Sequence, residues 1–414
     1  MVYLRYLIMA NKPRIRFRGF TEDWEQRKLD DIAKIKTGGG TPKTANPEYW
    51  SGNIPWIQSS DLVEGDIVHV NINKFINNNA LKNSAAKLIS RDSIALVTRV
   101  GVGKVAVINQ DFTTSQDFLS LSDFDGSDIK FLAYQLYRLM QENAKVLQGT
   151  SIKGITKTEL IEQSISIPSS GQEQNLISAV LSKIDSIITL HQCKLKKLNL
   201  AKKSLLQKLF PRNGSQIPGV RFKGFTDAWE QRKLDELTIF IGDGLHGTPK
   251  YDENGSYYFI NGNNLVDNKV SVTEETKKVA FEALGNDDRR LDSTAILMSI
   301  NGTIGTLARY NNENIMLGKS VAYITPKNIN RDFLFYQLQG NVIQSYFYKN
   351  LTGTTIKNLG LGTIKNTIVM STLSEEESTI GQFFYKLDQY ITLHQRKLER
   401  LQEVKKGLLQ KMFV

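Results

Sequence analysis

The chain has 414 residues, one cysteine and a formal net charge of +11. The single cysteine, Cys193, excludes an intrachain disulfide and is typical of a protein of the reducing cytoplasm. No apolar run approaches the ~20 residues of a membrane span, and residues 1–12 lack the pattern of a signal peptide, so we interpret them as an N-terminal extension. We therefore expect a cytoplasmic protein with no membrane segment.

Two blocks of sequence occur twice, in the same order. Residues 16–33 read RFRGFTEDWEQRKLDDIA, and residues 221–238 read RFKGFTDAWEQRKLDELT. Lysine-rich segments that begin at Lys183 and Lys386 form the second pair. The period is too long for a solenoid, so each copy is predicted to be a domain-sized module. The predicted segments are the extension (1–12), a globular domain (13–171), a conserved helix (172–212), a second globular domain (213–373) and a second conserved helix (374–414).

The stretches between the repeated blocks hardly resemble each other. Both alternate short β-branched runs with Gly, Asn, Asp and Pro, which predicts strands joined by turns. The predicted strands are Ile54–Ile57, Ile67–Asn71, Ser93–Val100, Lys104–Ile108, Phe118–Leu121, Tyr257–Ile260, Ala295–Ile300 and Val321–Ile324. One helix follows in each stretch, at Ile129–Leu147 and Asp332–Tyr348. We expect two compact α+β domains, each built on a twisted, mostly antiparallel sheet.

Each lysine-rich segment is predicted to be a long helix. Apolar residues recur at alternating steps of four and three, which is the seam pattern of a coiled coil. One helix cannot bury so narrow a seam, so the two are predicted to pair as an antiparallel coiled coil related by a pseudo-twofold axis. Roughly 30 residues at 1.5 Å each would give a rod on the order of 45 Å. The seam residues are Ile184, Ile188, His191, Leu195, Leu198, Lys202, Leu205 and Leu209, and Leu387, Ile391, His394, Leu398, Leu401, Lys405, Leu408 and Met412.

Polar residues occupy the same two seam positions in both helices. His191 and Lys202 correspond to His394 and Lys405. A polar seam residue costs stability but fixes register, and its recurrence favours that role. The alternative is chance tolerance near the solvated end of a short coiled coil.

The net positive charge lies entirely in the lysine-rich segments. Residues 183–212 hold eight basic residues against one acidic residue, and residues 386–414 hold seven against three. This placement indicates a polyanionic partner. The alternative is a basic helix face that is simply solvated.

Three loop types recur between the repeated blocks. Glycine-rich loops with Thr and Lys can offer backbone N–H groups and a cation to a phosphate, or they can simply form turns. The matched loops are 37–43 with 242–250, 149–153 with 353–357, and 99–104 with 301–305.

We find no catalytic or metal-binding motif in the sequence. None of the four histidines has metal-ligand spacing to enough Cys, His or carboxylate residues. Gly103 and Lys104 resemble the end of a phosphate-binding P-loop, but Val105 stands where such a loop needs Ser or Thr. We therefore expect no catalytic residue, no metal and no cofactor in this chain.

A set of motifs spans nearly the whole chain beyond residue 12. It comprises R-F-x-G-F-T-x-x-W-E-Q-R-K-L at 16–29 and 221–234, G-G-G-T-P at 38–42, I-P-W-I-Q-S-S-D-L at 54–62, G-T-S-I-K at 149–153, and I-T-L-H-Q-x-K-L at 188–195 and 391–398. In this order the motifs resemble the specificity subunit of Type I restriction–modification systems. The second globular domain departs from the pattern, because F-I-N-G-N-N-L at 259–265 replaces W-I-Q-S-S-D-L.

The resemblance implies a DNA-sequence-recognition subunit without catalytic activity. Each globular domain would be a target-recognition domain that reads one half of a bipartite, asymmetric target in double-stranded DNA. The coiled coil would set the spacer and dock two modification subunits and, through the complex, restriction subunits. S-adenosylmethionine, ATP and Mg²⁺ would be bound by those partners. The alternatives are a tandem scaffold whose domains bind a non-DNA partner, and an autonomous methyltransferase, which the missing methyl-donor motif disfavours.

Candidate DNA contacts follow from side-chain chemistry. Lysines and hydroxyls suit phosphates, whereas Arg suits guanine and Asn or Gln suits adenine in the major groove. The phosphate candidates are Lys43, Lys104, Lys153, Lys250, Lys319 and Lys357, with Thr41 and Thr248. The base-reading candidates are Arg99, Ser115 and Gln116 in the first domain and Asn263, Asn264 and Asn301 in the second.

Overall fold

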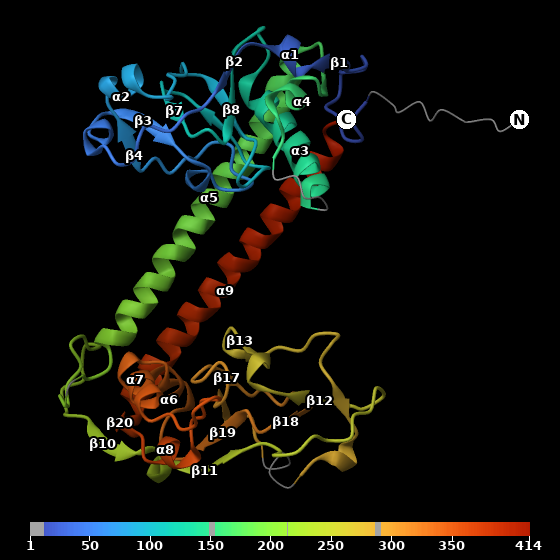
Figure 1. Cartoon of the computed structure of the whole chain (residues 1–414). Helices are drawn as coiled ribbons and strands as arrows, with labels where there is room; N and C mark the ends of the chain where they lie inside the picture. The colour runs from blue at the N-terminus through green and yellow to red at the C-terminus, as the bar shows by residue number, and fades with distance from the viewer. Residues whose placement is uncertain (1–11, 149–153, 213, 286–290) are drawn as a thin grey trace, which may run out of the picture. The chain divides into compact units, whose positions relative to one another are not determined.

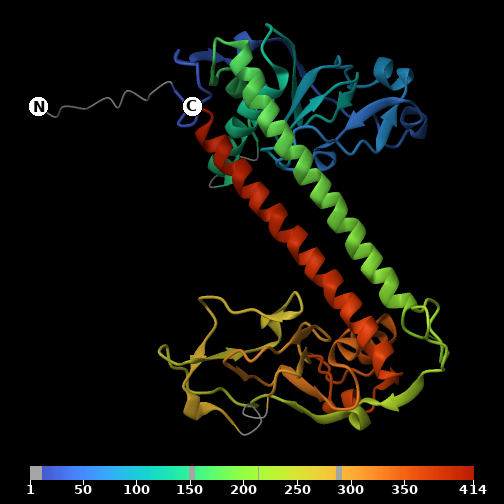
Figure 2. The same cartoon turned by 180° about the vertical axis from the view of Figure 1, so that it is seen from behind.

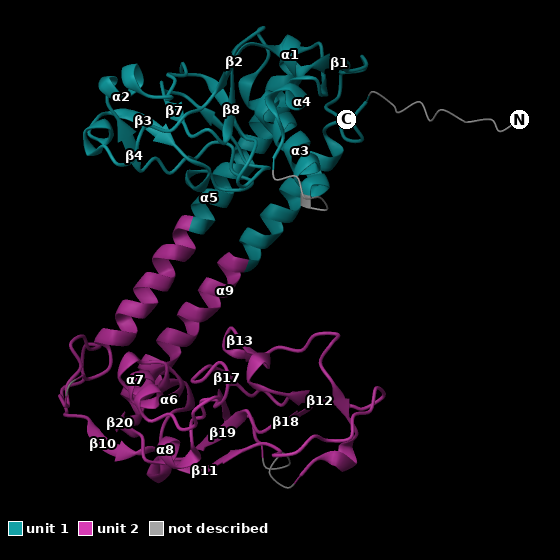
Figure 3. Ribbon diagram, viewed as in Figure 1, with its two compact units in different colours: residues 1–192, 396–414 teal, residues 193–395 magenta. Residues whose placement is uncertain are grey.

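The computed structural model describes residues 12–148, 154–212, 214–285 and 291–414. The chain forms two compact units, which Figure 3 colours separately: residues 1–192 with 396–414 (unit 1), and residues 193–395 (unit 2). Unit 2 is one continuous stretch of chain, whereas unit 1 combines two stretches. Within the described ranges, no helix is long and apolar enough to cross a membrane.

Unit 1 combines three small sheets with helices (Figure 1). Its strands are β1 (Glu25–Lys28), β2 (Ala33–Gly38), β3 (Ile54–Ile57), β4 (Lys74–Ile76), β5 (Ser93–Val97), β6 (Val105–Ile108), β7 (Thr113–Thr114), β8 (Phe118–Phe124) and β9 (Ser164–Ile167). Its helices are α1 (Leu29–Ile32), η1 (Pro47–Trp50), η2 (Ser59–Asp61), α2 (Asn78–Asn83), α3 (Ile129–Gln148) and α4 (Lys157–Ile161), with parts of α5 (Gly171–Lys208) and α9 (Ser374–Lys411). The sheets run β2-β8-β5-β6, β4-β3-β7 and β1-β9.

The four-stranded sheet of unit 1 lies between α3 and the three-stranded sheet. Along β5, Ile94 and Leu96 share a core with α3, while Ala95 and Val97 share a core with β3. This alternation follows from the two-residue period of a pleated strand. The loop that follows β5 is therefore attached to a strand that is packed on both faces of the sheet.

Unit 2 repeats this plan with a longer sheet. Figure 2 shows the chain from behind. Its strands are β10 (Glu230–Lys233), β11 (Thr238–Asp243), β12 (Tyr257–Ile260), β13 (Leu265–Val266), β14 (Lys269–Val270), β15 (Lys278–Val279), β16 (Ile296–Ser299), β17 (Leu307–Arg309), β18 (Ile315–Leu317), β19 (Val321–Pro326) and β20 (Ile368–Ser371). Its shorter helices are η3 (Leu234–Leu237), η4 (Gly262–Asn264), η5 (Phe281–Ala283), α6 (Arg331–Leu338), α7 (Asn341–Lys349) and α8 (Leu361–Lys365). The sheets run β11-β19-β16-β17-β14-β13, β15-β12-β18 and β10-β20.

The predicted α+β class is confirmed, and most strand pairs are antiparallel. Each unit has three sheets in the described residues, however, where one was predicted. The strand predicted at 67–71 is wrong: Ile67 accepts a hydrogen bond from Val107, and only Val70 forms an isolated bridge. The single helix predicted at 332–348 is also wrong, because extended backbone at Gly340 separates α6 from α7.

The first repeated block attaches to a helix end in each unit. In unit 1, Ile15 N–H donates to Lys411 O at the end of α9 (2.8 Å). In unit 2, Val220 N–H donates to Lys208 O at the end of α5 (2.9 Å). These bonds satisfy carbonyls that a helix end leaves without an intrahelical partner.

A buried ion pair secures the same block in each unit. Arg16 binds Glu173 through two hydrogen bonds of 2.7 and 2.8 Å, and Arg221 binds Glu376 through two of 2.7 Å. Both carboxylates are buried, where the planar guanidinium fork is a well-matched partner. In unit 2, Trp229 also donates to Glu376 (3.0 Å).

The two long helices contact each other within each unit. In unit 1, early residues of α5 share a core with the end of α9 and the residues just after it. In unit 2, the end of α5 and the residue just after it share a core with early residues of α9, so the segments run antiparallel. All sixteen predicted seam residues are buried or half-buried. The shared residues are Ile177, Leu181, Leu409, Met412 and Phe413 in unit 1, and Leu205, Leu209, Phe384 and Leu387 in unit 2.

Candidate nucleic-acid interface

The described residues of unit 1 surround a cavity of about 510 Å³ between three elements. Arg99 follows β5, Gln116 lies between β7 and β8, and Lys157 begins α4. The Arg99 and Gln116 side chains are exposed, and in the described part of the chain no carboxylate pairs with the Arg99 guanidinium. Ser115, predicted beside them, is buried and donates to the Asp117 carboxylate (3.2 Å).

Glycine-rich loops pass close to strand backbones in both units. A Cβ on Gly39 would lie 1.9 Å from Ser115 O, and one on Gly244 would lie 2.1 Å from Leu317 O. No side chain fits there, so glycine permits the close approach. The N–H groups of Gly40 and Gly244 donate to backbone carbonyls at 2.8 and 3.1 Å. These N–H groups therefore hold turns against strands and are not offered to a phosphate.

The close approach in unit 1 brings Thr41 to Gln116. The Thr41 hydroxyl, predicted to contact phosphate, donates to Gln116 Oε1 at 2.5 Å. An amide has an acceptor oxygen and a nitrogen with two donor hydrogens. Because Thr41 engages the oxygen, the Gln116 nitrogen is the part left to face a ligand.

Strand register identifies the position in unit 2 that corresponds to Gln116. Thr114 ends β7, which pairs with β3 in parallel, and Leu317 ends β18, which pairs with β12 in parallel. Two residues beyond each stand Gln116 and Lys319, both exposed. Lys319 therefore occupies the place of Gln116.

Arg99 corresponds in the same way to Asn301. The preceding residues, Thr98 and Ile300, donate their N–H groups to the segments that lead into β8 and β19 (2.8 and 2.9 Å). Asn301 is half-buried, and in the orientation that satisfies its neighbours its amide nitrogen donates to Asn358 Oδ1 at 2.7 Å. The two positions match in the fold, but only the Arg99 side chain is unpaired among the described residues.

The predicted phosphate-binding lysines differ in their surroundings. The Lys104 ammonium donates to Ser59 O and Leu62 O (2.9 and 2.8 Å), so it holds a loop. Lys153 lies outside the described residues. The exposed lysines are Lys43, Lys250, Lys319 and Lys357.

The dissimilar segments 54–62 and 259–265 form the same turn. Asp61 accepts from Gln58 N–H at 2.9 Å, and Asn264 accepts from Asn261 N–H at 3.0 Å. Asn264 also donates to Ser271 O (3.1 Å), so its side chain serves as a cap. The remaining candidates, Asn263 and Thr248, are exposed.

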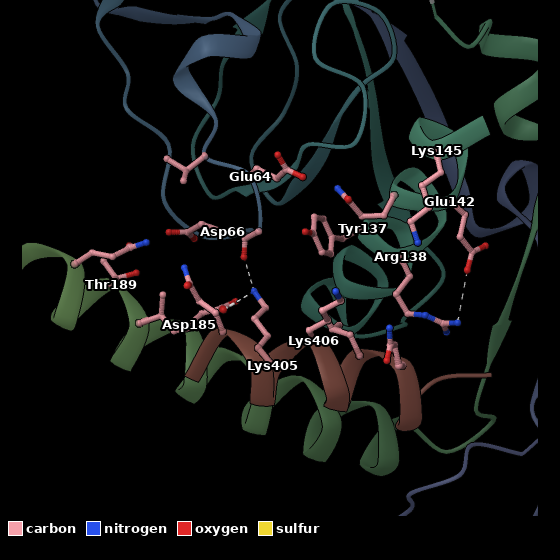
Figure 4. A pocket seen from close by; sticks show the side chains of 18 residues that line it. Glu64, Asp66, Tyr137, Arg138, Glu142, Lys145, Asp185, Thr189, Lys405 and Lys406 are labelled. Atoms are coloured by element: carbon pink, nitrogen blue, oxygen red, sulfur yellow. Dashed lines mark hydrogen bonds and ion pairs between the residues drawn. The ribbon is translucent and has the colours of Figure 1, made fainter. Parts of the chain in front are cut away.

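Lys405 of α9 joins the helices to the first globular domain in unit 1. Its ammonium lies 2.5 Å from the Asp185 carboxylate of α5 and donates to Gly65 O. Tyr134 of α3 donates to the same carboxylate (2.7 Å). Figure 4 shows Lys405 pointing toward Asp185 at the edge of a cavity of about 550 Å³. Burial raises the pKa of Asp185 and the Lys405 ammonium opposes that rise, while burial and Asp185 raise the pKa of Tyr134.

Unit 2 contains the matching network. Lys202 of α5 lies 2.7 Å from Asp388 of α9, and Tyr336 of α6 donates to that carboxylate (2.7 Å). Asn268, which has a left-handed φ of 64°, also donates to Asp388 (3.0 Å). Burial first, and then the Asp388 charge, raise the pKa of Tyr336, which therefore remains a neutral donor. Both seam lysines thus bind an aspartate of the other helix.

The seam pattern predicts the lysines of these networks but not their aspartates and tyrosines. Asp185 and Asp388 directly follow the seam residues Ile184 and Leu387 and recur in both copies. A repeated acid beside a repeated seam lysine was the signal that could have found them. The tyrosines carry a repeat signal as well, because Tyr134 and Tyr336 occupy the same place in the F-L-x-Y-Q-L segments at 131–136 and 333–338. An aromatic residue in a helix most often indicates core packing, so that signal alone does not reveal a hydrogen-bond partner.

Comparisons with known proteins agree with this repeated architecture. A family model described as Type I restriction modification DNA specificity domain matches residues 21–200 and 226–403. The Type I restriction enzyme MjaIX specificity subunit of Methanocaldococcus jannaschii is 26% identical, covering 94% of this chain and 93% of that protein. The EcoR124I/EcoR124II specificity subunit of Escherichia coli is 28% identical over 170 residues, covering 39% and 41%.

Solved structures show the same fold. The S subunit of a Type I restriction-modification system from M. genitalium superposes with a TM-score of 0.65 at 17% sequence identity. The match covers 97% of this chain and 99% of that one. Because the family model matches well over half of the sequence, the chain belongs to the family of Type I restriction modification DNA specificity domains and carries two copies of that domain.

Proposed function

We propose that the chain is the non-catalytic DNA-recognition subunit of a Type I restriction–modification complex. Each unit reads one half of a bipartite target in double-stranded DNA. The observation that carries this proposal is the difference in chemistry at matched positions on one scaffold: Arg99 and Gln116 in unit 1, Asn301 and Lys319 in unit 2. Identical readers would specify a palindrome, whereas these side chains favour two different half-sites.

The long helices supply the surface for partner subunits in this proposal. The C-terminal parts of these helices, together with the residues that follow them (183–212 and 386–414), carry the whole positive excess of the chain. Leu190 and Leu393, matched in the two I-T-L-H-Q segments, leave 65% and 47% of their surface exposed. Outward apolar residues at the same place in both copies suit two copies of one modification subunit. Restriction subunits would join through that complex, and S-adenosylmethionine, ATP and Mg²⁺ would be bound by the partners.

The helix pair also sets the distance between half-sites in this proposal. Removing one heptad from both helices would shorten a rod by roughly 10 Å, which is about three base pairs. We expect the unread spacer to shorten while both half-sites stay the same.

Reconstitution with partner subunits tests the proposal. We expect the purified chain to bind DNA weakly, with strong salt dependence and no methyl transfer. Adding the cognate modification subunits and S-adenosylmethionine should produce methylated adenines in one bipartite sequence, read by sequencing of a random DNA library. Methyl transfer by the chain alone, or methylation without sequence preference in the complex, would contradict the proposal.

A further inference from the structure

We propose that positions 116 and 319 are matched specificity-determining positions, one in each unit, and that Thr41 is the positioning residue for Gln116. This inference rests on the proposed function. It changes the predicted roles of two residues: Lys319 reads a base as well as carrying charge, and Thr41 orients a neighbouring side chain.

The place of Gln116 in unit 1 supports a reading role. It stands two residues after β7, a strand buried on both residues and paired with β3. Its own side chain is exposed and lines the cavity that Arg99 also lines. A side chain on a rigid strand end can hold one orientation against a base edge with little loss of conformational entropy.

The Thr41 hydroxyl gives that amide a direction. It donates to Gln116 Oε1 at 2.5 Å, and no described residue pairs with the amide nitrogen. The Gly39 backbone reaches this position because no side chain intervenes: a Cβ there would meet Ser115 O at 1.9 Å. An amide nitrogen donates to acceptors in the major groove, such as guanine O6 or N7, adenine N7 and thymine O4.

Lys319 takes the same place in unit 2. It stands two residues after β18, a fully buried strand paired in parallel with β12. Its ammonium is exposed, and none of the described residues pairs with it. A lysine at a base edge donates to guanine O6 and N7. Position 319 is therefore expected to select guanine.

The surroundings of Asn301 strengthen the case for Lys319. Asn301 matches Arg99 in the fold, but its amide binds Asn358 Oδ1 at 2.7 Å and Lys357 O at 3.2 Å. An amide held by these partners offers little to a base. In unit 2 we therefore expect Lys319, just before β19, to contact a base, and not Asn301, which follows β16.

A reciprocal exchange tests the inference in the reconstituted complex. Lys319→Gln and Gln116→Lys are each combined with the modification subunits, and methylation is sequenced on a random library. We expect each variant to change the preferred base at one position, by roughly 5- to 150-fold, and only in the half-site of its own unit. Lys223→Gln is the matched control, because Lys223 is also exposed in unit 2 but lies in the repeated block.

The outcomes separate this inference from the proposed function. A uniform loss of methylation on every sequence, with unchanged base preference, would show Lys319 to be a phosphate contact and would overturn the inference. An unchanged motif and rate in both exchange variants would overturn it as well, while leaving the subunit's function intact. Failure of the unmodified complex to show any sequence preference would instead overturn the proposed function.

The role of Thr41 is tested by two substitutions of similar size. Thr41→Val removes the hydroxyl, so the Gln116 amide can turn, and we expect the base preference at that position to broaden. Thr41→Ser keeps the hydroxyl and should restore the preference of the unmodified chain. If both variants behaved alike, Thr41 would not position Gln116; a role limited to stability would move the unfolding midpoint without changing the motif.

Discussion

The two units share a frame down to single hydrogen bonds, yet they differ where they meet solvent at the strand ends. Arg16 with Glu173 and Arg221 with Glu376 form the same bidentate pair. By contrast, position 116 carries an amide, and the corresponding position 319 carries an ammonium. Buried contacts repeat because packing tolerates few changes, whereas exposed strand ends can change at little cost to stability. The comparison separates residues that stabilise each DNA-recognition domain from exposed residues that determine which bases it recognises.

The largest expected effect concerns the buried carboxylate that holds the repeated block in unit 2. Glu376 accepts hydrogen bonds from Arg221, Trp229 and Thr372. We expect Glu376→Ala to destabilise unit 2 by about 3–5 kcal/mol, because it leaves the part-buried Arg221 guanidinium and the buried Trp229 N–H without their acceptor. Hydrogen exchange of peptides from each unit measures the loss. The exposed neighbour gives a control, Glu375→Ala, expected to cost at most about 0.5 kcal/mol; equal costs would contradict the prediction.

The seam lysines provide the second test. The Lys405 and Asp185 side chains are 7% and 4% exposed, whereas both partners of the Lys202–Asp388 pair are 15% exposed. We expect Lys405→Met to cost about 3 kcal/mol and Lys202→Met about 1–2 kcal/mol. Urea unfolding followed by hydrogen exchange of each unit measures both. Lys406→Met, which changes an exposed neighbour, is the control. A larger loss of stability in Lys202→Met than in Lys405→Met would contradict the prediction.

The same pair predicts a dependence on pH. Burial raises the folded pKa of Asp185 above its unfolded value, and Lys405 opposes that rise. A carboxyl group whose folded pKa lies above its unfolded pKa destabilises the fold. This penalty is absent below the unfolded pKa and grows as the pH rises from the unfolded to the folded pKa. We therefore expect Lys405→Met to regain stability relative to the unmodified chain as pH falls from neutrality. Adding Asp185→Asn should remove that difference.

A smaller effect compares the matched positions 99 and 301. Arg99→Ala should relax one base position by about 1–3 kcal/mol of discrimination, because a bidentate contact to guanine is lost. Asn301→Ala should leave the motif unchanged, because its amide binds Asn358 within the protein. Methylation sequencing of the reconstituted complexes reports both. A relaxed motif in Asn301→Ala alone would reverse the assignment.

The smallest expected effect concerns phosphate contacts. Lys357 is exposed, whereas Lys104 donates to two backbone carbonyls. We expect Lys357→Gln to weaken DNA binding equally on all sequences and to reduce the salt slope by about one. Lys104→Gln should lower stability and leave the salt slope unchanged. Fluorescence anisotropy across a salt series distinguishes the two results.

Local periodicity and internal repeats predicted the α+β class and both long helices, but only a minority of the strands. The seam pattern identified both long helices, and β3 and β12 were predicted with correct bounds. The Thr41–Gln116 bond was out of reach because it joins residues 75 positions apart through the close approach of a glycine loop. Lys104 and Lys357 look alike in sequence, since only the fold decides which ammonium meets a carbonyl and which meets water. Contacts between residues that lie far apart in the sequence therefore cannot be predicted from local sequence patterns.

The division of the chain also sets an order of synthesis. Unit 2 is continuous, so all of its residues have been made before residue 396 is added. The core of unit 1 includes Leu409, Met412 and Phe413, and Arg138 donates to Val414 O at 2.9 Å. Domains of growing chains usually fold from the N-terminus onward, but here the core of unit 1 needs residues that are made after all of unit 2. All residues of unit 2 are therefore available before the core of unit 1 can be completed, although unit 1 begins earlier in the chain.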